Sequence, residues 1–448
     1  MKNYAIILAA GNGSRMKVDV PKCVHQIIRK PMIQYVYESI DDLLINKTLV
    51  VISENHLDTF SSVLPSSVEF VIQKNQIGTG DAVYQSLSHI KNLLGYTLIL
   101  PGDMPLVNKD ELNAFIKYHK ESKNDVSVLT TIMDDPTNYG RIIRKNGEII
   151  DIVEQEDLSD EQKQIKEVNT GIYLVSTCVL VNLIESNNLP DIVSNAIKTN
   201  RKVGTYVSNN PSFYIDVNDF YTVAIVESKI KLNTNKKHLL NGVNIISPET
   251  VTIASNVKID PGVTIYPNSF ITGDSRVYKG ATIGPDSEVH NSIIDEKAII
   301  RHSLVTDSYV GKNTTVGPFA HLRNNTHVGD DCRIGNYVEI KNSRIGNLTK
   351  ISHLTYIGDT TCGSNVNWGC GTVTVNYDGK NKNKTIVGDN VFIGCNTNLI
   401  APLKVGNNAF IAAGSTITED VPDEAFSIAR ERQVTKEDYA RKYEYKKK

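Results

Sequence analysis

Aliphatic residues recur at every sixth position through much of the second half of this chain. Three runs keep this phase, and they are Ile253 to Val289, Val310 to Ile340 and Val387 to Ile417. A period of six matches neither the 3.6 residues of a helical turn nor the alternation of a strand, so it requires a short strand and a corner repeated many times. Such a repeat is typical of the hexapeptide form of the parallel β-helix. Because inward aliphatic side chains fill the interior of such a prism, any site must lie on its outer surface or between subunits.

Strand-like and helix-like patterns alternate in the first half of the chain. Strands are predicted at 4–8, 49–53, 70–73, 97–100 and 126–131. Apolar residues at helical spacing lie between them, at 32–44, 83–94 and 112–116. This alternation predicts a Rossmann-like, mostly parallel sheet with helices on both faces, which binds ligands at the carboxyl ends of its strands. Residues 141–145 and 148–153 predict a hairpin added to that sheet.

The length of 448 residues exceeds what one hydrophobic core usually supports, so we expect two domains. The α/β domain is predicted to span residues 1–218. Residues 219–248 carry apolar positions at helical spacing among charges, which predicts a helical linker arm. Residues 249–448 are predicted to form a left-handed parallel β-helix of hexapeptide repeats with a basic tail at 442–448.

The composition excludes several classes of protein. A formal net charge of −2 argues against a general nucleic-acid binder or a membrane-surface binder. The six cysteines include no CxxC pair and no dense framework, so we expect a reduced, cytoplasmic setting. The apolar stretch near the start is too short for a signal peptide, and no apolar run approaches the length of a membrane span.

A glycine-rich loop follows the first predicted strand. Its sequence is Leu8-Ala-Ala-Gly-Asn-Gly-Ser-Arg-Met16, followed by Pro21-Lys22. Gly11 and Gly13 suit a tight loop whose backbone N–H groups approach phosphates, and Arg15 and Lys22 add positive charge. Met16 replaces the third glycine of the dinucleotide-binding fingerprint, and the Walker A pattern is absent. The loop resembles the LxxGxGxRM motif and downstream Pro-Lys of the sugar-nucleotide pyrophosphorylases, which implies a nucleotidyltransferase fold.

That resemblance implies uridylyl transfer, in which a sugar 1-phosphate oxygen attacks the α-phosphorus of UTP and pyrophosphate leaves. Arg15 and Lys22 are the implied catalytic residues, because they stabilise the negative charge that spreads over the phosphates. Asp103, at the end of a predicted strand, and Asn218 are the implied ligands of Mg²⁺. The alternative for Asp103 is a cap on the helix that follows.

The base and the sugar of the nucleotide have their own motifs. Gln73 and the segment 76–80 resemble the part of UDP-N-acetylglucosamine-forming enzymes that reads uracil, and an amide can match the donor and acceptor of a uracil edge. The segment 188–192 lacks an insert of many family members, which predicts a shorter pocket wall. Residues implied to bind UTP or the UDP-sugar are Leu8, Ala9, Ala10, Gly11, Lys22, Gln73, Gly78, Thr79, Gly140, Glu154, Asn169 and Asn218.

The six-residue phase slips after Ile340, and a non-repeating loop replaces one repeat between Val375 and Ile386. Polar motifs surround these breaks at 317–323, 336–341, 352–359, 365–371 and 376–382. Together with the N-terminal motifs, and in the same order, they resemble a bifunctional bacterial transferase family. Its members acetylate glucosamine 1-phosphate with acetyl-CoA and then uridylylate the product.

His353 is the general base that this resemblance implies. Glucosamine 1-phosphate carries an ammonium group at neutral pH, and an imidazole can accept the proton that must leave before the amine attacks the thioester. Residues implied to bind glucosamine 1-phosphate are Arg323, Lys341, Tyr356 and Asn367, with Lys382 beside them. Residues implied at the acetyl-CoA site are Cys370, Asn376, Tyr377, Cys395, Ala413 and Arg430, with Asn376 orienting the histidine or the amine.

Two cysteines depart from the usual pattern of that family. Cys370 stands where Ala is common, and Cys395 stands where a Ser contacts the reacting amine. A thiol is a weaker hydrogen-bond donor than a hydroxyl, so the second change bears on the rate of acetyl transfer.

Three hypotheses follow from the sequence. The first is a bifunctional enzyme that uses Mg²⁺, UTP and acetyl-CoA, assembled as a homotrimer because one subunit cannot enclose outer-surface sites. The second keeps only uridylyl transfer, with the β-helix as a trimerisation scaffold. The third is a regulatory or assembly protein without catalysis, which the presence of Arg15, Lys22 and Asp103 disfavours.

Overall fold

The computed structural model describes residues 2–11, 13–90, 92, 94–184 and 188–442. The chain divides into two compact units, Met1–Ile230 and Lys231–Lys448. The predicted basic tail lies outside the described residues except for Lys442. No helix within the described part of the chain is both long and apolar enough to cross a membrane.

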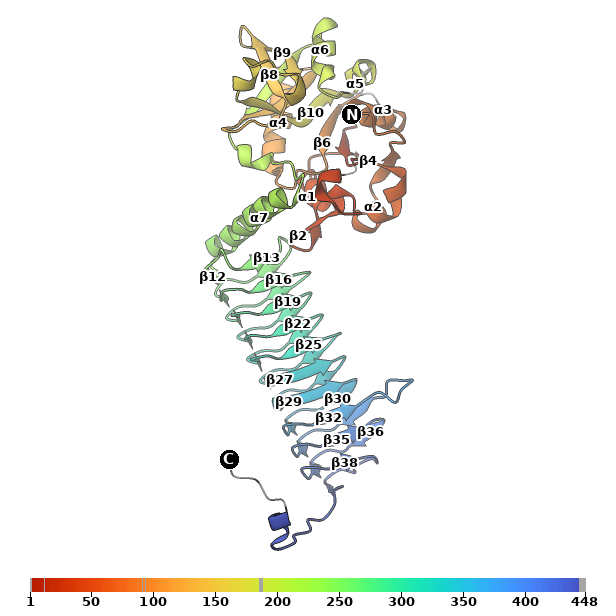
Figure 1. Ribbon diagram of the computed structural model, residues 1–448, viewed down its shortest axis with the longest axis vertical. Coiled ribbons are helices and arrows are strands. Elements are labelled where there is room, and N and C mark those ends of the chain that lie inside the picture. The colour runs from red at the N-terminus through yellow and green to blue at the C-terminus, as the bar shows by residue number, and fades with distance from the viewer. Residues whose placement is uncertain (1, 12, 91, 93, 185–187, 443–448) are drawn as a thin grey trace. The chain divides into compact units, whose positions relative to one another are not determined.

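A mixed sheet forms the centre of the first unit (Figure 1). Its main strands, in spatial order, are β11 (Val203–Ser208), β7 (Val126–Ile132), β10 (Glu167–Ser176), β6 (Tyr96–Pro101), β1 (Tyr4–Leu8), β4 (Lys47–Ile52) and β5 (Glu69–Ile72). The strands β6, β1, β4 and β5 are parallel, whereas β10 runs antiparallel to both of its neighbours. The predicted hairpin is present as β8 (Arg141–Lys145) and β9 (Glu148–Val153), and β8 pairs with β10.

Helices cover both faces of this sheet because successive residues of each strand point to opposite sides. Ala5 and Ile7 of β1 pack in one core with α1 (Met32–Ser39), α2 (Leu57–Val63) and α4 (Lys109–Ser122). Tyr4 and Ile6 pack in the other core with α3 (Thr79–Ser86), α5 (Thr177–Leu183) and α6 (Asp191–Lys198). The Rossmann-like arrangement predicted from the alternating pattern is therefore confirmed.

Two predicted helices are shorter than their apolar spacing suggested. The spacing at 32–44 continues past the end of α1 at Ser39, because Asp42 and Leu44 have positive φ and cannot continue a right-handed helix. Leu44 is exposed rather than part of a helical apolar face. The spacing at 83–94 overlaps α3 and a 3-10 turn, Leu87–His89, after which Ile90 is extended.

A long helix, α7 (Phe220–Leu240), occupies most of the predicted linker arm. Its second half belongs to the second unit, where Asn235 Nδ2 donates to the carbonyl oxygens of Pro248 and Val251. These bonds satisfy the backbone of the segment that leads into the repeats.

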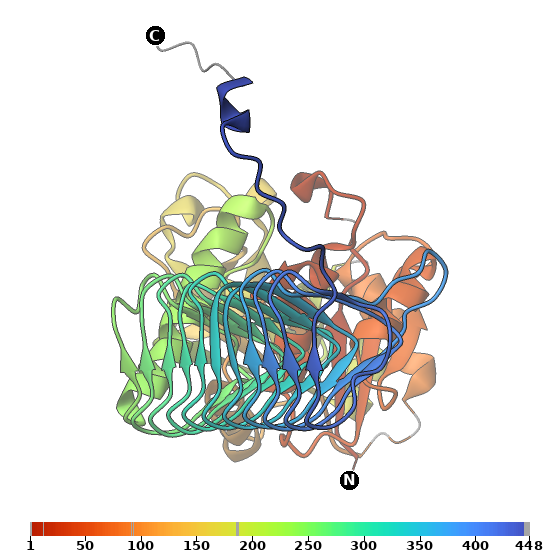
Figure 2. The ribbon, with the colours of Figure 1, turned by 90° about the horizontal axis from the view of Figure 1, so that it is seen from below.

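The second unit is a left-handed parallel β-helix, in which strands of successive coils lie side by side (Figures 1 and 2). The first face contains β12 (Asn244–Ile245), β15 (Thr264–Ile265), β18 (Thr282–Ile283), β21 (Ile299–Ile300), β24 (Thr315–Val316), β31 (Asn367–Trp368), β34 (Phe392–Ile393), β37 (Phe410–Ile411) and β39 (Phe426–Ser427). The second contains β13 (Thr252–Ile253), β16 (Phe270–Thr272), β19 (Glu288–His290), β22 (Leu304–Thr306), β25 (His321–Arg323), β32 (Val373–Val375), β35 (Asn398–Ile400) and β38 (Thr416–Ile417). The third contains β14 (Lys258–Ile259), β17 (Arg276–Val277), β20 (Ile293–Ile294), β23 (Tyr309–Val310), β26 (His327–Val328), β28 (Arg344–Ile345), β30 (Thr360–Cys362), β33 (Thr385–Val387) and β36 (Leu403–Val405).

One strand from each face makes one coil, and the residues of the six-residue runs fill its interior. Ile271, Ile283 and Val289 are completely buried, as the periodicity predicted. A coil of three complete repeats takes 18 residues, as where Ile253 pairs with Ile271, whereas the coil from Val289 to Val305 takes 16. The interior is closely packed, mostly by aliphatic side chains, which leaves the outer surface as the place for polar chemistry.

Two strands pass unbroken around the corner between the first and second faces, called the first corner below. They are β27 (Arg333–Lys341) and β29 (Lys350–Gly358), and they pair in register from Arg333↔Lys350 to Lys341↔Gly358. The predicted non-repeating loop lies at 376–384, between β32 and β33. Both phase breaks are thus real features of the β-helix.

Two candidate active sites

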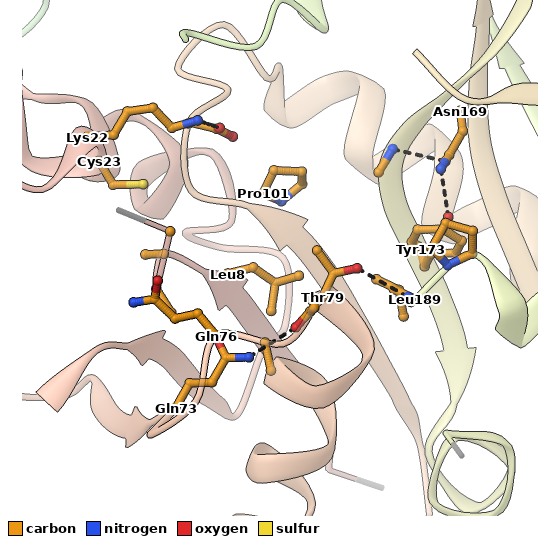
Figure 3. A pocket seen from close by; sticks show the side chains of 18 of the residues that line it. Leu8, Lys22, Cys23, Gln73, Gln76, Thr79, Pro101, Asn169, Tyr173 and Leu189 are labelled. Atoms are coloured by element: carbon orange, nitrogen blue, oxygen red, sulfur yellow. Dashed lines mark hydrogen bonds and ion pairs between the residues drawn. The ribbon is translucent and has the colours of Figure 1, made fainter. Parts of the chain in front are cut away.

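The first unit has a cavity of about 460 Å³ beside the ends of β1 and β6 (Figure 3). The structure brings together in its wall these residues predicted from sequence: Leu8, Ala9, Ala10, Gly11, Lys22, Gln73, Gly78, Thr79, Asp103, Glu154 and Asn169. Strand β1 ends at Leu8 and β6 at Pro101, so the parallel strands deliver these groups to one edge of the sheet.

Lys22 forms the charged end of this cavity. Its Nζ donates to the carboxylate of Asp103 and, over 2.9 Å, to the amide oxygen of Asn218. Burial alone would lower the pKa of Lys22, but the Asp103 carboxylate more than offsets it and holds that pKa above its ordinary value. Side-chain oxygen atoms from two distant parts of the chain, those of Asp103 and Asn218, therefore meet at the Lys22 ammonium group.

Asp216 adds a second carboxyl group near Lys22. Burial, and then the charge of Asp103, raise the pKa of Asp216 to about 8, although Lys22 and Arg15 oppose the shift. Its Oδ1 is buried and accepts no hydrogen bond. A buried oxygen without a donor is costly unless a cation or a ligand group satisfies it.

Gln73 lines the cavity and is almost completely buried. Its Nε2 donates to the carbonyl oxygen of Gly78 over 3.0 Å and to a carboxylate oxygen of Asp81 over 2.8 Å. A carboxylate only accepts hydrogen bonds when ionised, so Asp81 fixes which end of the Gln73 amide faces it. Thr79 closes the wall, since its hydroxyl accepts from the backbone N–H of Leu189 over 3.1 Å.

The opposite end of the cavity is held by the hairpin and β10. Asn169 Nδ2 donates to the hydroxyl of Tyr173 over 2.8 Å, and its Oδ1 accepts from the backbone N–H of Gly171 over 3.0 Å. The carboxylate of Glu154 lies against Gly140, where a Cβ would come within 3.2 Å of an oxygen of Glu154. Burial raises the pKa of Glu154, and neighbouring carboxylates add to the shift.

Three predicted residues of the first unit do not line the cavity, and one of them, Asn218, is joined to its wall through Lys22. Gly140 lies behind Glu154 and accepts a backbone hydrogen bond from Asn169 over 2.9 Å. Arg15 is exposed, and its charge acts on the carboxyl groups of Asp216 and Asp219.

The second unit gathers positive charge on its second face. Arg323 and Lys341 occupy paired positions on adjacent strands, and the Arg323 guanidinium donates to Glu339. The loop 376–384 brings Lys382 against Lys341, and this contact lowers the pKa of Lys341 below its ordinary value. Like charges this close favour the binding of an anion between them.

Tyr356 and Asn376 complete the second-face cluster. Both lie over Gly358, where a Cβ would be 2.5 Å from the Tyr356 hydroxyl and 2.6 Å from Asn376 Nδ2. Asn376 Nδ2 donates to Asp359 over 2.6 Å, so Asp359 sets the direction of the Asn376 amide. Tyr377 is exposed and donates to the Gly379 carbonyl oxygen over 2.8 Å within the same loop.

The predicted base and three acetyl-CoA residues occupy equivalent places at the first corner of successive coils. Ile351 and Trp368 are paired on adjacent coils. His353 comes two residues after Ile351, and Cys370 comes two residues after Trp368. Cys395 and Ala413 occupy the same place on the next two coils and continue this corner column. The backbone N–H of Asn396 donates to the carbonyl oxygen of Cys370, and the backbone N–H of Gly414 donates to the carbonyl oxygen of Cys395. His353 is exposed, Cys370 is half-buried and Cys395 is exposed.

Two predicted residues lie apart from the second-face cluster within one chain. Asn367 belongs to the first face, in register with Lys350, whereas Tyr356 belongs to the second. Arg430 follows β39, and its Cδ lies 3.4 Å from the position of a Cβ on Gly414. Arg430 therefore approaches the end of the corner column.

Comparison with known proteins decides the family. Residues 4–213 match the family model described as nucleotidyl transferase, 248–353 match the GMPPB C-terminal domain, and 384–419 match the bacterial transferase hexapeptide of six repeats. The chain is 48% identical to the bifunctional protein GlmU of Acholeplasma laidlawii, and the match covers 98% of each chain. It is 43% identical to the bifunctional protein GlmU of Streptococcus mutans, over 99% of this chain and 98% of that one. The chain belongs to the GlmU family. It is therefore a transferase, with a nucleotidyltransferase unit and a hexapeptide transferase unit.

Several residues of the two GlmU-family sites were not singled out from the sequence. Asp81, Asp216, Glu339 and Asp359 each hold or adjoin a predicted side chain through hydrogen bonds or charge. Glu339 and Asp359 stand inside the motifs 336–341 and 352–359, and Asp216 precedes Asn218 by two residues. The resemblance named the charged and polar residues of each motif, but not the acidic side chains that hold or adjoin them.

Proposed function

We propose that this chain makes UDP-N-acetylglucosamine in two steps. The second unit transfers an acetyl group from acetyl-CoA to glucosamine 1-phosphate, and the first transfers a uridylyl group from UTP to the N-acetylated product. The observation that carries the proposal is a separate charged site in each unit, Lys22 with Asp103 in the first and Arg323 with Lys341 and Lys382 in the second.

The first site fits Mg²⁺. Asp103 and Asn218 offer a carboxylate and an amide oxygen, the hard ligands that this ion prefers, and the Lys22 ammonium already bridges them. The buried oxygen of Asp216, which accepts no hydrogen bond, supports a need for more positive charge there. Mg²⁺ would be held by Asp103 and Asn218 and would neutralise charge on the triphosphate.

In uridylyl transfer, the residues of the chain mainly position and stabilise. Backbone N–H groups of the loop after β1 would hold phosphate oxygens, and the open space beside Gly11, where a Cβ would have no atom within 4 Å, leaves room for them. A sugar 1-phosphate oxygen attacks the α-phosphorus of UTP, its bond to pyrophosphate breaks, and Lys22 and Arg15 stabilise the charge. Gln73 reads the base, while Glu154 and Asn169 hold the acetamido sugar.

In acetyl transfer, Arg323, Lys341 and Lys382 bind the phosphate of glucosamine 1-phosphate. His353 accepts a proton from the amine, whose nitrogen then attacks the thioester carbonyl carbon. The carbon–sulfur bond breaks, and coenzyme A leaves as a thiol once it takes up a proton. The acyl carrier lies along the corner column of Cys370, Cys395 and Ala413, with Arg430 at its end.

Assembly as a homotrimer in the cytoplasm is part of this proposal. Asn367 and the Tyr356 cluster lie on different faces of one chain, so a neighbouring chain is needed to bring both to one substrate. Small-molecule substrates are the only partners besides other copies of the chain.

The test follows the two products separately. Purified protein is mixed with glucosamine 1-phosphate, acetyl-CoA, UTP and Mg²⁺, and thiol and pyrophosphate release are measured. We expect thiol release without UTP, and pyrophosphate release only when acetyl-CoA is present. Pyrophosphate release from N-acetylglucosamine 1-phosphate without any thiol release would instead support a uridylyltransferase with a scaffold β-helix.

Two variants show whether the sites are independent. Asp103→Ala is expected to lower pyrophosphate release at least a hundredfold, the order found when an electrostatic stabiliser is removed, and to leave thiol release unchanged. His353→Ala is expected to do the reverse. Loss of both activities in either variant would contradict two separate sites.

A further inference from the structure

The two unbroken strands place a side chain beside His353. Strands β27 and β29 continue through the first corner, whereas β24 and β25, or β31 and β32, are separate strands on either side of it. Gly335 makes this possible, because a Cβ there would lie 1.9 Å from the carbonyl oxygen of Ser352. The backbones of the two coils are therefore in close contact immediately before the corner.

Asn336 and His353 are direct partners in that paired stretch. The Asn336 Oδ1 atom lies 2.7 Å from His353 Nδ1. An amide oxygen is an acceptor only, so this contact requires the proton of the neutral imidazole to be on Nδ1. The lone pair that can accept a proton is then on Nε2.

We propose that Asn336 is a positioning residue for acetyl transfer, which fixes the Nδ1–H tautomer of His353 and leaves Nε2 as the basic atom. The inference rests on the proposed function, in which His353 takes the proton from the amine. A base acts only if its lone pair faces the proton to be removed. The tautomer of His353 therefore affects the rate of acetyl transfer.

No carboxylate competes for this role among the described residues. None of their Asp or Glu side chains forms an ion pair or hydrogen bond with His353. Besides Asn336 on the preceding coil, the corner presents Cys370 on the following coil. Thr355 donates to the backbone oxygen of His353 and leaves the ring free. The orientation of the imidazole thus depends on a neutral amide.

The first experiment observes the tautomer directly, without turnover. The protein is labelled with ¹⁵N-histidine, and His353→Gln identifies the His353 ring signals. We expect the Nδ1–H form in the unaltered protein and the Nε2–H form in Asn336→Leu, because that form is favoured in an unconstrained imidazole. Nε2–H in the unaltered protein would overturn the proposal, since Asn336 would then donate to Nδ1.

The second experiment compares two substitutions by thiol release. Asn336→Leu is expected to lower kcat about tenfold to a hundredfold, within the contribution of a general base, with little change in KM. Asn336→Asp keeps an acceptor and adds negative charge that stabilises the imidazolium, so it should retain activity with the acid limb of its pH profile moved to higher pH. If Asn336→Asp loses as much activity as Asn336→Leu, the amide acts as a donor and the proposal fails.

A matched control lies elsewhere on the β-helix. Thr272 Oγ1 lies 2.9 Å from Nδ1 of His290, on neighbouring coils that carry none of the proposed site residues. Thr272→Val should leave kcat and the pH profile unchanged. Full activity of His353→Ala would refute the proposed base, whereas the tautomer measurement would still decide the role of Asn336.

Discussion

Gly13 lies so close to Lys22 that a Cβ on Gly13 would be 2.7 Å from the Cβ of Lys22. The φ angle of Gly13 is +58°, in the left-handed region that favours glycine. Gly13→Ala should therefore displace Lys22 from Asp103 and Asn218. We expect pyrophosphate release to fall about a hundredfold, the order for misplaced catalytic groups, while thiol release is unchanged.

Gly147 provides the control for backbone strain alone. It has a φ of +86°, yet a Cβ there would meet no atom within 4 Å. Gly147→Ala thus adds a comparable strain of about 1–2 kcal/mol without touching Lys22. Equal loss of pyrophosphate release in both variants would show that strain, rather than displacement of Lys22, is responsible.

The sequence predicted the chain-level organisation well because periodicity reports directly on burial. Ile271 and the other aliphatic residues at six-residue spacing are buried because each fills the inward position of its repeat. The end of α1 was not predictable from spacing, since the positive φ of Asp42 and Leu44 overrides an apolar pattern that continues to Leu44. Helical spacing describes what a segment could bury, while the turn that follows determines where it stops.

The candidate sites divide in a similar way. Motif resemblance named Lys22 and Asp103, and the structure joins them by an ion pair. It could not reveal that Asp81 holds Gln73 or that Asn336 faces His353, because these pairs depend on strand register and loop packing. The six-residue pattern predicts that successive coils stack, but not which outer side chains meet, such as Asn336 and His353, which are 17 residues apart.

Asp81 gives a test of nucleotide choice. The unaltered protein should prefer UTP over ATP, because a base that leaves the buried Gln73 amide unpaired loses binding energy. Gln73→Leu should reduce the ratio of kcat/KM for UTP to that for ATP by about a hundredfold, and Asp81→Leu should reduce it less, because the Gln73 amide is then free to rotate.

Gln85 is the matched control for Asp81. Its Nε2 donates to the other carboxylate oxygen of Asp81 over 2.9 Å, but Gln85 is not part of the cavity wall. Gln85→Leu should leave the nucleotide ratio unchanged. Comparable turnover of UTP and ATP by the unaltered protein would count against the assignment of Gln73.

His119 makes the stability of the first unit depend on pH. Burial lowers the pKa of His119 from 6.5 to about 4, and its Nδ1 lies 2.9 Å from the Ser127 hydroxyl. The native state therefore holds the neutral form, while the unfolded chain takes up a proton as pH falls below 6.5. The unfolding free energy should decrease by up to about 3 kcal/mol between pH 6.5 and pH 4, and no further from this group below that.

Urea unfolding at a series of pH values checks this expectation. Circular dichroism follows both units, and the single tryptophan, Trp368, reports separately on the β-helix. His119→Gln should be less stable at pH 7 but lose less stability on acidification than the unaltered protein. An unchanged pH dependence in His119→Gln would contradict a buried neutral imidazole.

Separation of the proposed acetyl-transfer residues on one chain leads to a test by mixing subunits. Asn367 lies on the first face, Tyr356 on the second, and Arg430 lies beyond the last paired strand, where it can reach a neighbouring chain. If sites form between subunits of a trimer, inactive His353→Ala and inactive Arg430→Ala chains should restore thiol release when unfolded, mixed and reassembled. Random reassembly at equal amounts leaves about a quarter of the sites with both groups intact.

Mixing His353→Ala with His353→Gln is the matched control, because both chains lack the same group and no shared site can recover it. Asn367→Ala replaces Arg430→Ala as the second partner if the arginine proves to act within its own chain. Sedimentation should show a trimer for every mixture, so that absence of rescue cannot reflect failed assembly. A fully active monomer, or trimers without rescue for either partner, would show that each chain carries a complete site. The substrate alone would then have to span the distance between the first and second faces of one chain.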